Sequence, residues 1–130
     1  LGLDIIVPYN SVVFCPLHGY VHKLGKENKK GNYGGYLVLK HKIKDQTLYS
    51  LYGHIKTPHK VQLGQKILAG QELARIGKET DSGGWFCHLH LQIITQKAMN
   101  EGYSEWGYIT EKLLPIVEEY FPNPNSLFKR

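Results

Sequence analysis

Short runs of hydrophobic and polar residues, separated by glycine and proline, fill the chain as far as about residue 94. Runs such as YLVLKHKI, DQTLYSLYGHI and KVQLGQKI read as candidate strands from their length and their β-branched and aromatic residues. Gly64, Gly70 and Gly77 follow one another at nearly even intervals, as turns between short strands would. The pattern predicts a mostly β domain with antiparallel sheets.

The last part of the chain has a different pattern. Residues 95–110 show no clear period and are predicted to be irregular. The stretch TEKLLPIVEEY at 110–120 predicts a short helix, with Thr110 as its cap and Pro115 as an interruption. A short C-terminal helix therefore accompanies the strands in the predicted fold.

The chain is predicted to form a single domain. Its 130 residues are enough to bury a hydrophobic core, and no linker, low-complexity tract or clear repeat divides them. We expect one β domain over residues 1–130, with a core at 1–94 and a C-terminal extension at 95–130. Because the sequence opens with LGLD rather than with a methionine, we also expect it to be a fragment of a longer chain.

Composition narrows the class of protein. A hydrophobic content of 42% with 21% charged residues is that of a globular domain. No apolar run approaches the roughly 20 residues of a membrane helix, so we expect no membrane span. The net charge of +5 permits an acidic partner, but the basic residues are scattered outside KLGKENKKG, which does not favour nucleic-acid binding. Cys15 and Cys87, each in an apolar setting, predict buried free thiols.

The stretch WFCHLHLQI places two histidines two positions apart in a strand-like run. Residues two apart share a face of a strand, so His88 and His90 lie about 6.6 Å apart along it, with Gln92 on the same face. Leu89 and Leu91 then turn toward the core. Two imidazoles at this separation can converge on one metal ion. The alternative is a pair of partly exposed strand histidines, but the pairing after a flexible loop favours the metal.

A catalytic zinc site needs about three protein ligands and an open position, so further ligands must come from elsewhere in the chain. Asp4, directly before an apolar run, is the best carboxylate candidate, and an exposed turn acid is the alternative. His54 ends an aromatic-rich strand and could project into a cleft, although a lone histidine there is more often a surface residue. His18 and His22 could replace a missing ligand, but surface placement is more typical.

Taken in order, these pieces resemble the lysostaphin-type zinc endopeptidases, a family of glycyl-glycine and murein peptidases. The family pattern is H-x-G-x-D before an apolar run, a strand ending in histidine, Y-[AG]-H-[LI], V-x-x-G-Q-x-[IL]-[AL]-x-x-G and H-L-H. This sequence has LGLDIIVP, YLVLKH, LYGHI, VQLGQKILAG and HLHLQI in that order over about residues 1–94. The resemblance implies an antiparallel barrel-sandwich-like fold of the duplicated hybrid type.

Carried over position by position, the resemblance implies that Asp4 and His90 are ligands of a zinc ion. It implies that His88 is the general base for the zinc-bound water and that His54 is a second catalytic histidine that stabilises the transition state. His41 matches a recurrent family histidine whose role the pattern does not specify. The implied reaction is hydrolysis of peptide bonds, with peptidoglycan cross-bridges or stem peptides as substrates.

One departure from the family pattern affects the ligand set. The family's first ligand is a histidine four residues before the aspartate, a position that falls immediately before Leu1. We expect that histidine to precede Leu1 in the parent protein. The alternative is a degenerate, inactive site in a domain that binds wall fragments or acts as a scaffold.

Three further stretches of the sequence, GNYGGYLVLKH, GGW and PNPNSL, are similar to those of a subgroup of the family. In that subgroup, such a domain is joined to kinase-like and aminotransferase domains. That subgroup implies partner domains in the same chain and a cytoplasmic location. The wider family implies a cell-envelope or secreted protein.

A different class of function also fits part of the chain. VQLGQKILAGQELARIG resembles the glycine-punctuated hairpins of biotinyl and lipoyl carriers, and sugar-phosphotransfer domains have a similar β arrangement. A carrier needs a lysine at an exposed hairpin tip, normally flanked by methionine. Met99 is the only methionine and is near no suitable lysine. A phosphotransfer protein could use paired histidines without a metal.

Overall fold

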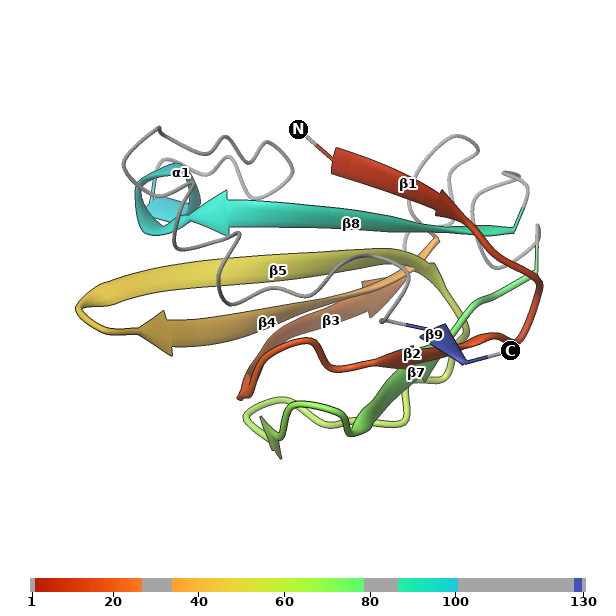
Figure 1. Cartoon of the computed structure of the whole chain (residues 1–130), viewed down its shortest axis with the longest axis horizontal. Helices are drawn as coiled ribbons and strands as arrows, with labels where there is room; N and C mark the ends of the chain where they lie inside the picture. The colour runs from red at the N-terminus through yellow and green to blue at the C-terminus, as the bar shows by residue number, and fades with distance from the viewer. Residues whose placement is uncertain (1, 27–33, 79–86, 101–127, 130) are drawn as a thin grey trace.

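The structure is a computed structural model that describes residues 2–26, 34–78, 87–100 and 128–129. Strands dominate these ranges, and the mostly β, antiparallel fold predicted from the sequence is confirmed (Figure 1). The strands are β1 (Gly2–Ile6), β2 (Val12–Phe14), β3 (Gly19–Lys26), β4 (Gly35–Ile43), β5 (Gln46–Ile55), β6 (Lys66–Ile67), β7 (Glu72–Arg75), β8 (His88–Thr95) and β9 (Phe128–Lys129), and the helix α1 is Gln96–Asn100.

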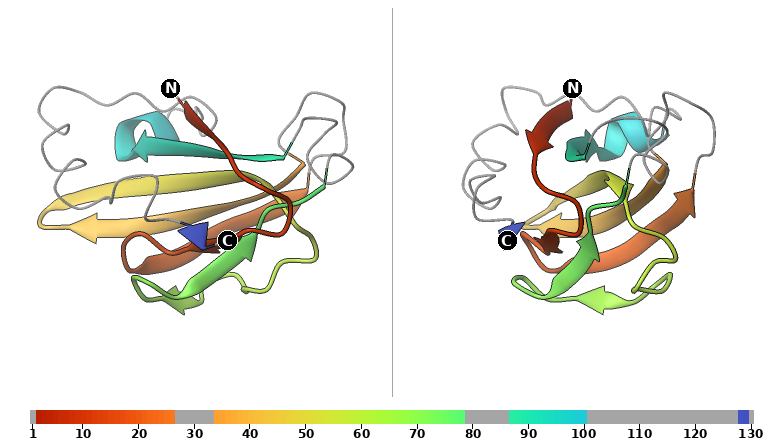
Figure 2. Two further views of the ribbon diagram at one scale, coloured as in Figure 1. Left: turned by 45° about the vertical axis from the view of Figure 1, so that its right-hand side comes forward. Right: turned by 90° about the vertical axis from the view of Figure 1, so that its right-hand side faces the viewer.

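Two antiparallel sheets make up the described part of the chain. The larger sheet has the strand order β1-β8-β5-β4-β3-β6, and the smaller one has the order β7-β2-β9. The chain leaves β1 at the right of Figure 1 and crosses from this edge of the larger sheet to β2, the middle strand of the smaller one. The views in Figure 2 place the smaller sheet against one face of the larger one. The site described below lies on the opposite face.

The main core lies between the two sheets. Leu37, Leu39 and Tyr52 alternate with outward-facing residues along β4 and β5 and are fully buried. They belong to one cluster with Val13 and Leu73 of the smaller sheet. Burying each such aliphatic side chain stabilises the fold by about 1.5–3 kcal/mol relative to leaving it exposed. The strand alternation read from the sequence thus builds the interface between the sheets.

A second apolar cluster covers the opposite face of the larger sheet. Val38, Tyr49, Leu51 and Ile94 are buried there, and Met99 of α1 packs against them. Large parts of the central strands are therefore buried on both faces. This explains why β5 is nearly all buried from Leu48 onward instead of alternating between buried and exposed residues.

Two expectations about local structure need correction. The sequence was predicted to be irregular directly after β8, but α1 forms there, and the Gln96 side-chain amide donates to Asn100 Oδ1 at 2.7 Å across one helical turn. The run KVQLGQKI was predicted to be a strand, but only its last two residues pair, because Gly64 at φ 80° makes a turn closed by Gln65 N–H on Gln62 O. The helix predicted at 110–120 lies outside the described residues.

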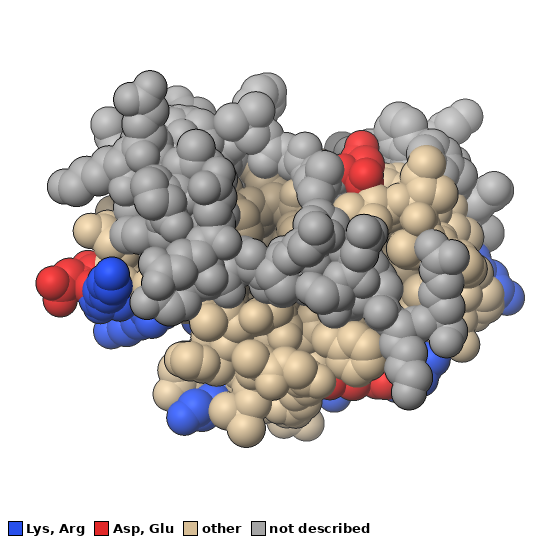
Figure 3. Space-filling model, in the orientation of Figure 1, with Lys and Arg blue, Asp and Glu red and all other residues tan. Residues whose placement is uncertain are grey.

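The remaining composition-based expectations concern thiols, charge and membranes. Cys15 is buried, Cys87 is half-buried, and both are free, with burial raising the pKa of the Cys15 thiol to about 11. Basic side chains lie dispersed around the margin of the face shown in Figure 3. No helix in the described part of the chain is long and apolar enough to cross a membrane.

Candidate functional site

Strands from opposite ends of the matched sequence bring the predicted site residues together. β1 pairs with β8 in a register that sets Asp4 directly opposite His90, and Ile6 opposite His88. The two histidines share one face of β8, while Leu89 is fully buried in the core on the other face. The alternation predicted from HLHLQI is therefore confirmed.

One carboxylate oxygen faces both histidines. Asp4 Oδ1 lies 2.8 Å from His90 Nδ1 and 3.8 Å from His88 Nε2. The side chains differ in exposure, at 62% for Asp4, 18% for His90 and 5% for His88. The cluster is thus open to solvent on the side of the carboxylate and closed on the side of His88.

His54 reaches the same cluster because of a bulge in β5. Across from it on β4, Tyr36 pairs with Gly53 and the preceding residue, Gly35, pairs with Ile55, so His54 is an extra residue in its strand. Its backbone has φ 64°, a left-handed conformation that few residues other than glycine adopt, although histidine is tolerated there better than most. The Gly77 N–H donates to His54 O at 3.0 Å and holds the bulge.

The bulge sets the direction of the His54 side chain. Its ring centroid lies 4.1 Å from that of His88 and 6.4 Å from that of His90. Regular alternation would place His54 on the same face as Tyr52, in the main core. The sequence placed His54 at the site by resemblance, but nothing in the local pattern revealed the bulge that delivers it.

Two further residues of the site were not predicted to have a role there. Gly53 lies directly across from His90 on β5, so no side chain stands directly opposite the imidazole on that strand. Gln92 is 2% exposed, and its Oε1 lies 3.1 Å from His90 Nε2. A glutamine on the histidine face of an otherwise apolar strand was the signal that could have identified it.

His41 lies outside this cluster, on the core face of β4. Its Nδ1 contacts His18 O at 3.1 Å and its Nε2 contacts Ser50 Oγ at 2.7 Å, with Tyr52 OH a further 2.8 Å from that hydroxyl. Because a carbonyl only accepts, the neutral ring donates from Nδ1, Ser50 donates to Nε2, and Tyr52 donates to Ser50. Burial lowers the pKa of His41. The network is internal to the fold.

The histidines near the start of the chain do not join the site either. His18 contributes its backbone carbonyl to His41. The ring of His22 packs edge-on against Tyr49 with centroids 4.9 Å apart. Burial lowers the pKa of His22, and the charges of Lys40 and Lys23 lower it further. Among the described residues, neither histidine takes the place of a third ligand.

The chemistry of the donor set fits part of a zinc site. No group of three His, Cys, Asp or Glu side chains forms a preformed metal site in the ranges that the structure describes. Asp4 and His90 supply a carboxylate oxygen and an imidazole nitrogen, both ordinary zinc ligands. Bonds of about 2.0 Å at a tetrahedral angle put two ligand atoms about 3.3 Å apart. The 2.8 Å contact would have to open slightly, which the exposed Asp4 side chain can do.

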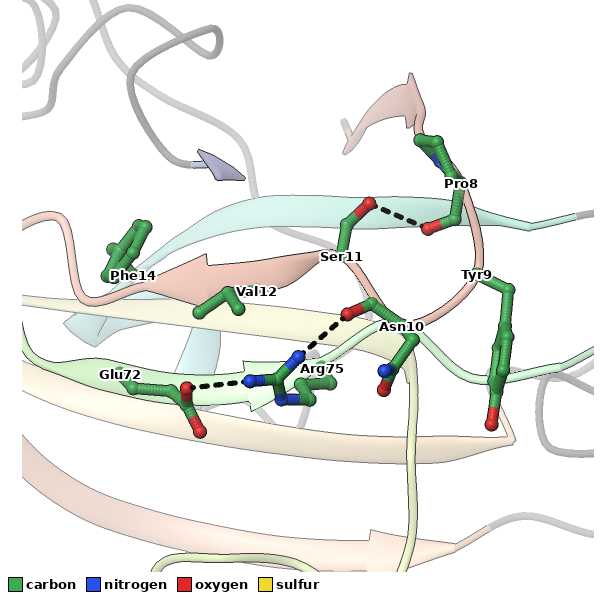
Figure 4. A pocket seen from close by; sticks show the side chains of 8 residues that line it. All are labelled: Pro8, Tyr9, Asn10, Ser11, Val12, Phe14, Glu72 and Arg75. Atoms are coloured by element: carbon green, nitrogen blue, oxygen red, sulfur yellow. Dashed lines mark hydrogen bonds and ion pairs between the residues drawn. The ribbon is translucent and has the colours of Figure 1, made fainter. Parts of the chain in front are cut away.

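A cavity of about 610 Å³ lies beside the smaller sheet, away from this cluster (Figure 4). Its charged side chains engage each other and the backbone, since the Arg75 guanidinium donates to Glu72 at 3.4 Å and to Asn10 O at 3.2 Å. None of the lining residues belongs to the histidine cluster. They are Pro8, Tyr9, Asn10, Ser11, Val12, Phe14, Glu72 and Arg75.

Comparisons with known proteins agree with this geometry. The model of peptidase family M23 matches residues 1–101. No curated protein matches the sequence significantly. Several solved structures share the fold, at identities too low to transfer more than the fold itself.

Three of these structures illustrate the likeness. The structure of LytU is 19% identical, the match covers 99% of this chain and 79% of that chain, and the TM-score is 0.66. The catalytic domain of the antimicrobial peptidase lysostaphin from Staphylococcus simulans is 18% identical over 90% of this chain and 77% of its own, with a TM-score of 0.62. The catalytic domain of a mutant of the prophage-encoded M23 protein EnpA from Enterococcus faecalis is 22% identical over 73% and 67%, with a TM-score of 0.60.

Proposed function

The chain belongs to peptidase family M23 and thus carries a peptidase domain, and we propose that it is a zinc-dependent metalloendopeptidase that hydrolyses peptidoglycan-type peptides. The single observation that carries the proposal is the position of one Asp4 carboxylate oxygen, 2.8 Å from His90 Nδ1 and 3.8 Å from His88 Nε2. The register of β1 with β8 sets Asp4 opposite His90, and the Asp4 side chain stays mostly exposed to solvent there.

Asp4 and His90 are the residues that would hold the zinc ion. Zinc ligands must be deprotonated carboxylates or neutral imidazoles, and an aspartate and a histidine are residue types that can supply them. When bound, zinc polarises the carbonyl of the scissile bond and lowers the pKa of a water molecule to about 7. A third protein ligand is required, and the family pattern places a histidine four residues before Asp4.

His88 and His54 supply the proton chemistry in this proposal. His88, next to the carboxylate and almost fully buried, takes a proton from the attacking water at an imidazole nitrogen and returns it to the leaving amine. His54, whose ring lies 4.1 Å from that of His88, supports the negative charge that develops on the carbonyl oxygen. Gly53 leaves space over His90 for an extended peptide.

The substrate class rests on two supports. The ordered motifs resemble those of glycyl-glycine and murein peptidases, and lysostaphin, an antimicrobial peptidase, shares the fold. Peptides of the bacterial wall, with glycine beside the scissile bond, are the substrates that we propose to test first.

The test uses this chain extended by one histidine before Leu1. We expect it to cleave pentaglycine or stem peptides, to lose cleavage when a chelator removes zinc, and to regain it when zinc is returned. Asp4→Ala should abolish both zinc binding and cleavage. Asp45→Ala changes an exposed carboxylate in the β4–β5 turn and should alter neither. Failure to bind zinc would contradict the ligand assignment.

A second candidate is a peptidase-like domain that binds wall peptides without cleaving them. The observation that favours it is the lack of a preformed group of three ligands within the described residues. Zinc bound at one equivalent, with peptide binding but no cleavage by the extended chain, would favour this second function.

A further inference from the structure

Another cavity lies at the end of the larger sheet where β3 begins, and we call it the lysine cavity. Its volume is about 460 Å³, within the range of about 300–1,000 Å³ that is usual for small-ligand sites. Three of its described lining residues are lysines, and none of them is an acid. The lining residues are His18, Gly19, Tyr20, Lys40, Lys42 and Lys66.

The strand register places the three lysines on one face of the sheet. Lys40 of β4 and Lys66 of β6 both lie directly opposite Tyr20 of β3. Lys42 follows Lys40 by two residues and therefore shares its face. From strand geometry, the Cα atoms of Lys40 and Lys42 are about 6.6 Å apart, and those of Lys40 and Lys66 are about 9–10 Å apart. Because each ammonium ends a flexible four-carbon stem, all three can reach one ligand in the cavity.

Within the described ranges, no carboxylate forms an ion pair with any of these three lysines. Glu72 is engaged by Lys60 and Arg75. Asp4 lies in the histidine cluster, and Asp45 is exposed in the turn between β4 and β5. Like charges that share one face of a sheet repel one another, so this arrangement favours an anionic ligand.

The donors of the lysine cavity fit a phosphate group better than a carboxylate. The planar fork of arginine is the usual match for a carboxylate, whereas lysine binds phosphate as a point charge. A phosphate monoester carries up to two negative charges and three acceptor oxygens, which is one oxygen for each ammonium. Tyr20 is 52% exposed and adds a ring face and a hydroxyl beside the lysines. Such a side chain suits the carbon skeleton and the hydroxyl groups of a polyol or sugar.

We propose that the lysine cavity binds the phosphate ester of a polyol or sugar, with its three lysines around the phosphate and Tyr20 against the carbon skeleton. A free sugar or polyol phosphate has this chemistry. A polymer of phosphodiester-linked polyols presents it in series, so that neighbouring phosphates can each meet a lysine. The experiment below separates these two sources.

The lysine cavity is separate from the histidine cluster, although both lie on the same face of the sheet. Lys40 lies opposite Tyr49 on β5, and His90 lies opposite Gly53 on the same strand. Four residues of an extended strand, or about 13 Å, separate these two positions on β5. A ligand in the lysine cavity therefore leaves the histidines open, and its binding does not require the proposed peptidase activity.

The test measures binding to the zinc-free chain by isothermal titration calorimetry. The probes are glycerol phosphate, a short polymer of glycerol phosphate, and neutral glycerol. We expect the phosphate probes to bind and glycerol not to bind. Tighter binding of the monoester, per phosphate, assigns the cavity to a free phosphate ester, and tighter binding of the polymer assigns it to the polymer. Added salt should weaken either interaction, because it screens partly exposed charges.

Lysine variants locate the binding. Lys42→Gln and Lys66→Gln should each weaken it about 2- to 5-fold, and the variant that also carries Lys40→Gln should bind no better to the phosphate probes than to glycerol. Lys56→Gln is the matched control, because it removes the same charge beside Tyr9, outside the cavity. It should leave the affinity nearly unchanged. Should the triple variant fail to fold, the two single variants, both at exposed positions, still decide the question.

Several results would overturn the proposal. Neither phosphate probe binds, or binding is the same in the lysine variants as in the unchanged chain. A glutamate tripeptide that binds more tightly than the phosphate probes would assign the cavity to carboxylates. A single-stranded oligonucleotide that binds more tightly than the polyol polymer would assign it to nucleic acid. Phosphate binding by a chain that neither holds zinc nor cleaves peptides would support this inference and count only against the proposed function.

Discussion

Two histidine clusters lie on opposite faces of the same sheet and differ in how their hydrogen bonds are completed. On the core face, His41, Ser50 and Tyr52 are all 0% exposed. Within this hydrogen-bond network, each donor has one acceptor. On the other face, His90 has an oxygen acceptor at both ring nitrogens, and its partner Asp4 is mostly exposed. The first cluster is closed within the core, whereas the second is open to solvent on the side of the Asp4 carboxylate.

The difference separates a structural histidine from one that is available for binding. A buried network with a donor for every acceptor stabilises one conformation and has nothing left to offer a ligand. A cluster with an excess of acceptors at a partly open site favours a positive charge. Burial of a histidine alone does not distinguish the two, since His88 is nearly as buried as His41.

The largest effect that would test this contrast is on catalysis. His88→Ala in the chain extended by one histidine should lower the rate of peptide hydrolysis by about 10²- to 10⁴-fold, because the proton acceptor is lost. His22→Ala is the control, since His22 packs on Tyr49 outside the cluster. Retention of full activity by His88→Ala, measured by cleavage of a labelled peptide, would remove His88 from the mechanism.

An intermediate effect is expected on stability. Ser50→Ala leaves His41 Nε2 and the Tyr52 hydroxyl without their partner in the core, which should lower the free energy of unfolding by about 1–3 kcal/mol. Asp4→Ala, at an exposed position, should change it by less than about 0.5 kcal/mol. Chemical denaturation measures both values. Equal stabilities of the two variants would contradict the division between a structural and a functional cluster.

The smallest expected effect is on the pH dependence of stability. Because burial lowers the pKa of His41 below the ordinary 6.5, the unfolded chain binds a proton there before the folded chain does. The free energy of unfolding should therefore fall as the pH falls below about 6.5. His41→Gln should flatten this slope, and His22→Gln, at a more exposed ring, should flatten it less. Denaturation midpoints from about pH 7.5 to about pH 5.5 measure the slope. An unchanged slope in His41→Gln would assign the pH dependence to other groups.

Much of the fold and the composition of the site followed from the sequence. The alternation in HLHLQI separated Leu89 from the histidines, and the ordered motifs placed Asp4, His54, His88 and His90 in one group, which the structure brings together. Alternation is readable because its period is fixed by backbone geometry. The roles of these residues stay predictions.

The structural details that the sequence did not predict depend on contacts between residues far apart in the chain. The bulge at His54 arises from the register between β4 and β5 and from the Gly77 N–H that holds it. The role of His41 depends on Ser50 of the neighbouring strand β5 and on the carbonyl of His18. These features depend on contacts between strands, and the spacing of residues along the sequence does not predict such contacts.

The pairing of β1 with β8 also determines at which stage of folding the candidate site forms. Asp4 and His90 are separated by 86 positions and meet only along an edge strand of the finished sheet. Segments near a terminus open locally at a lower free energy than the core strands do. In a chain that is incompletely folded, or in which β1 has separated from β8, Asp4 and His90 are apart. The candidate site therefore exists only once the sheet is complete.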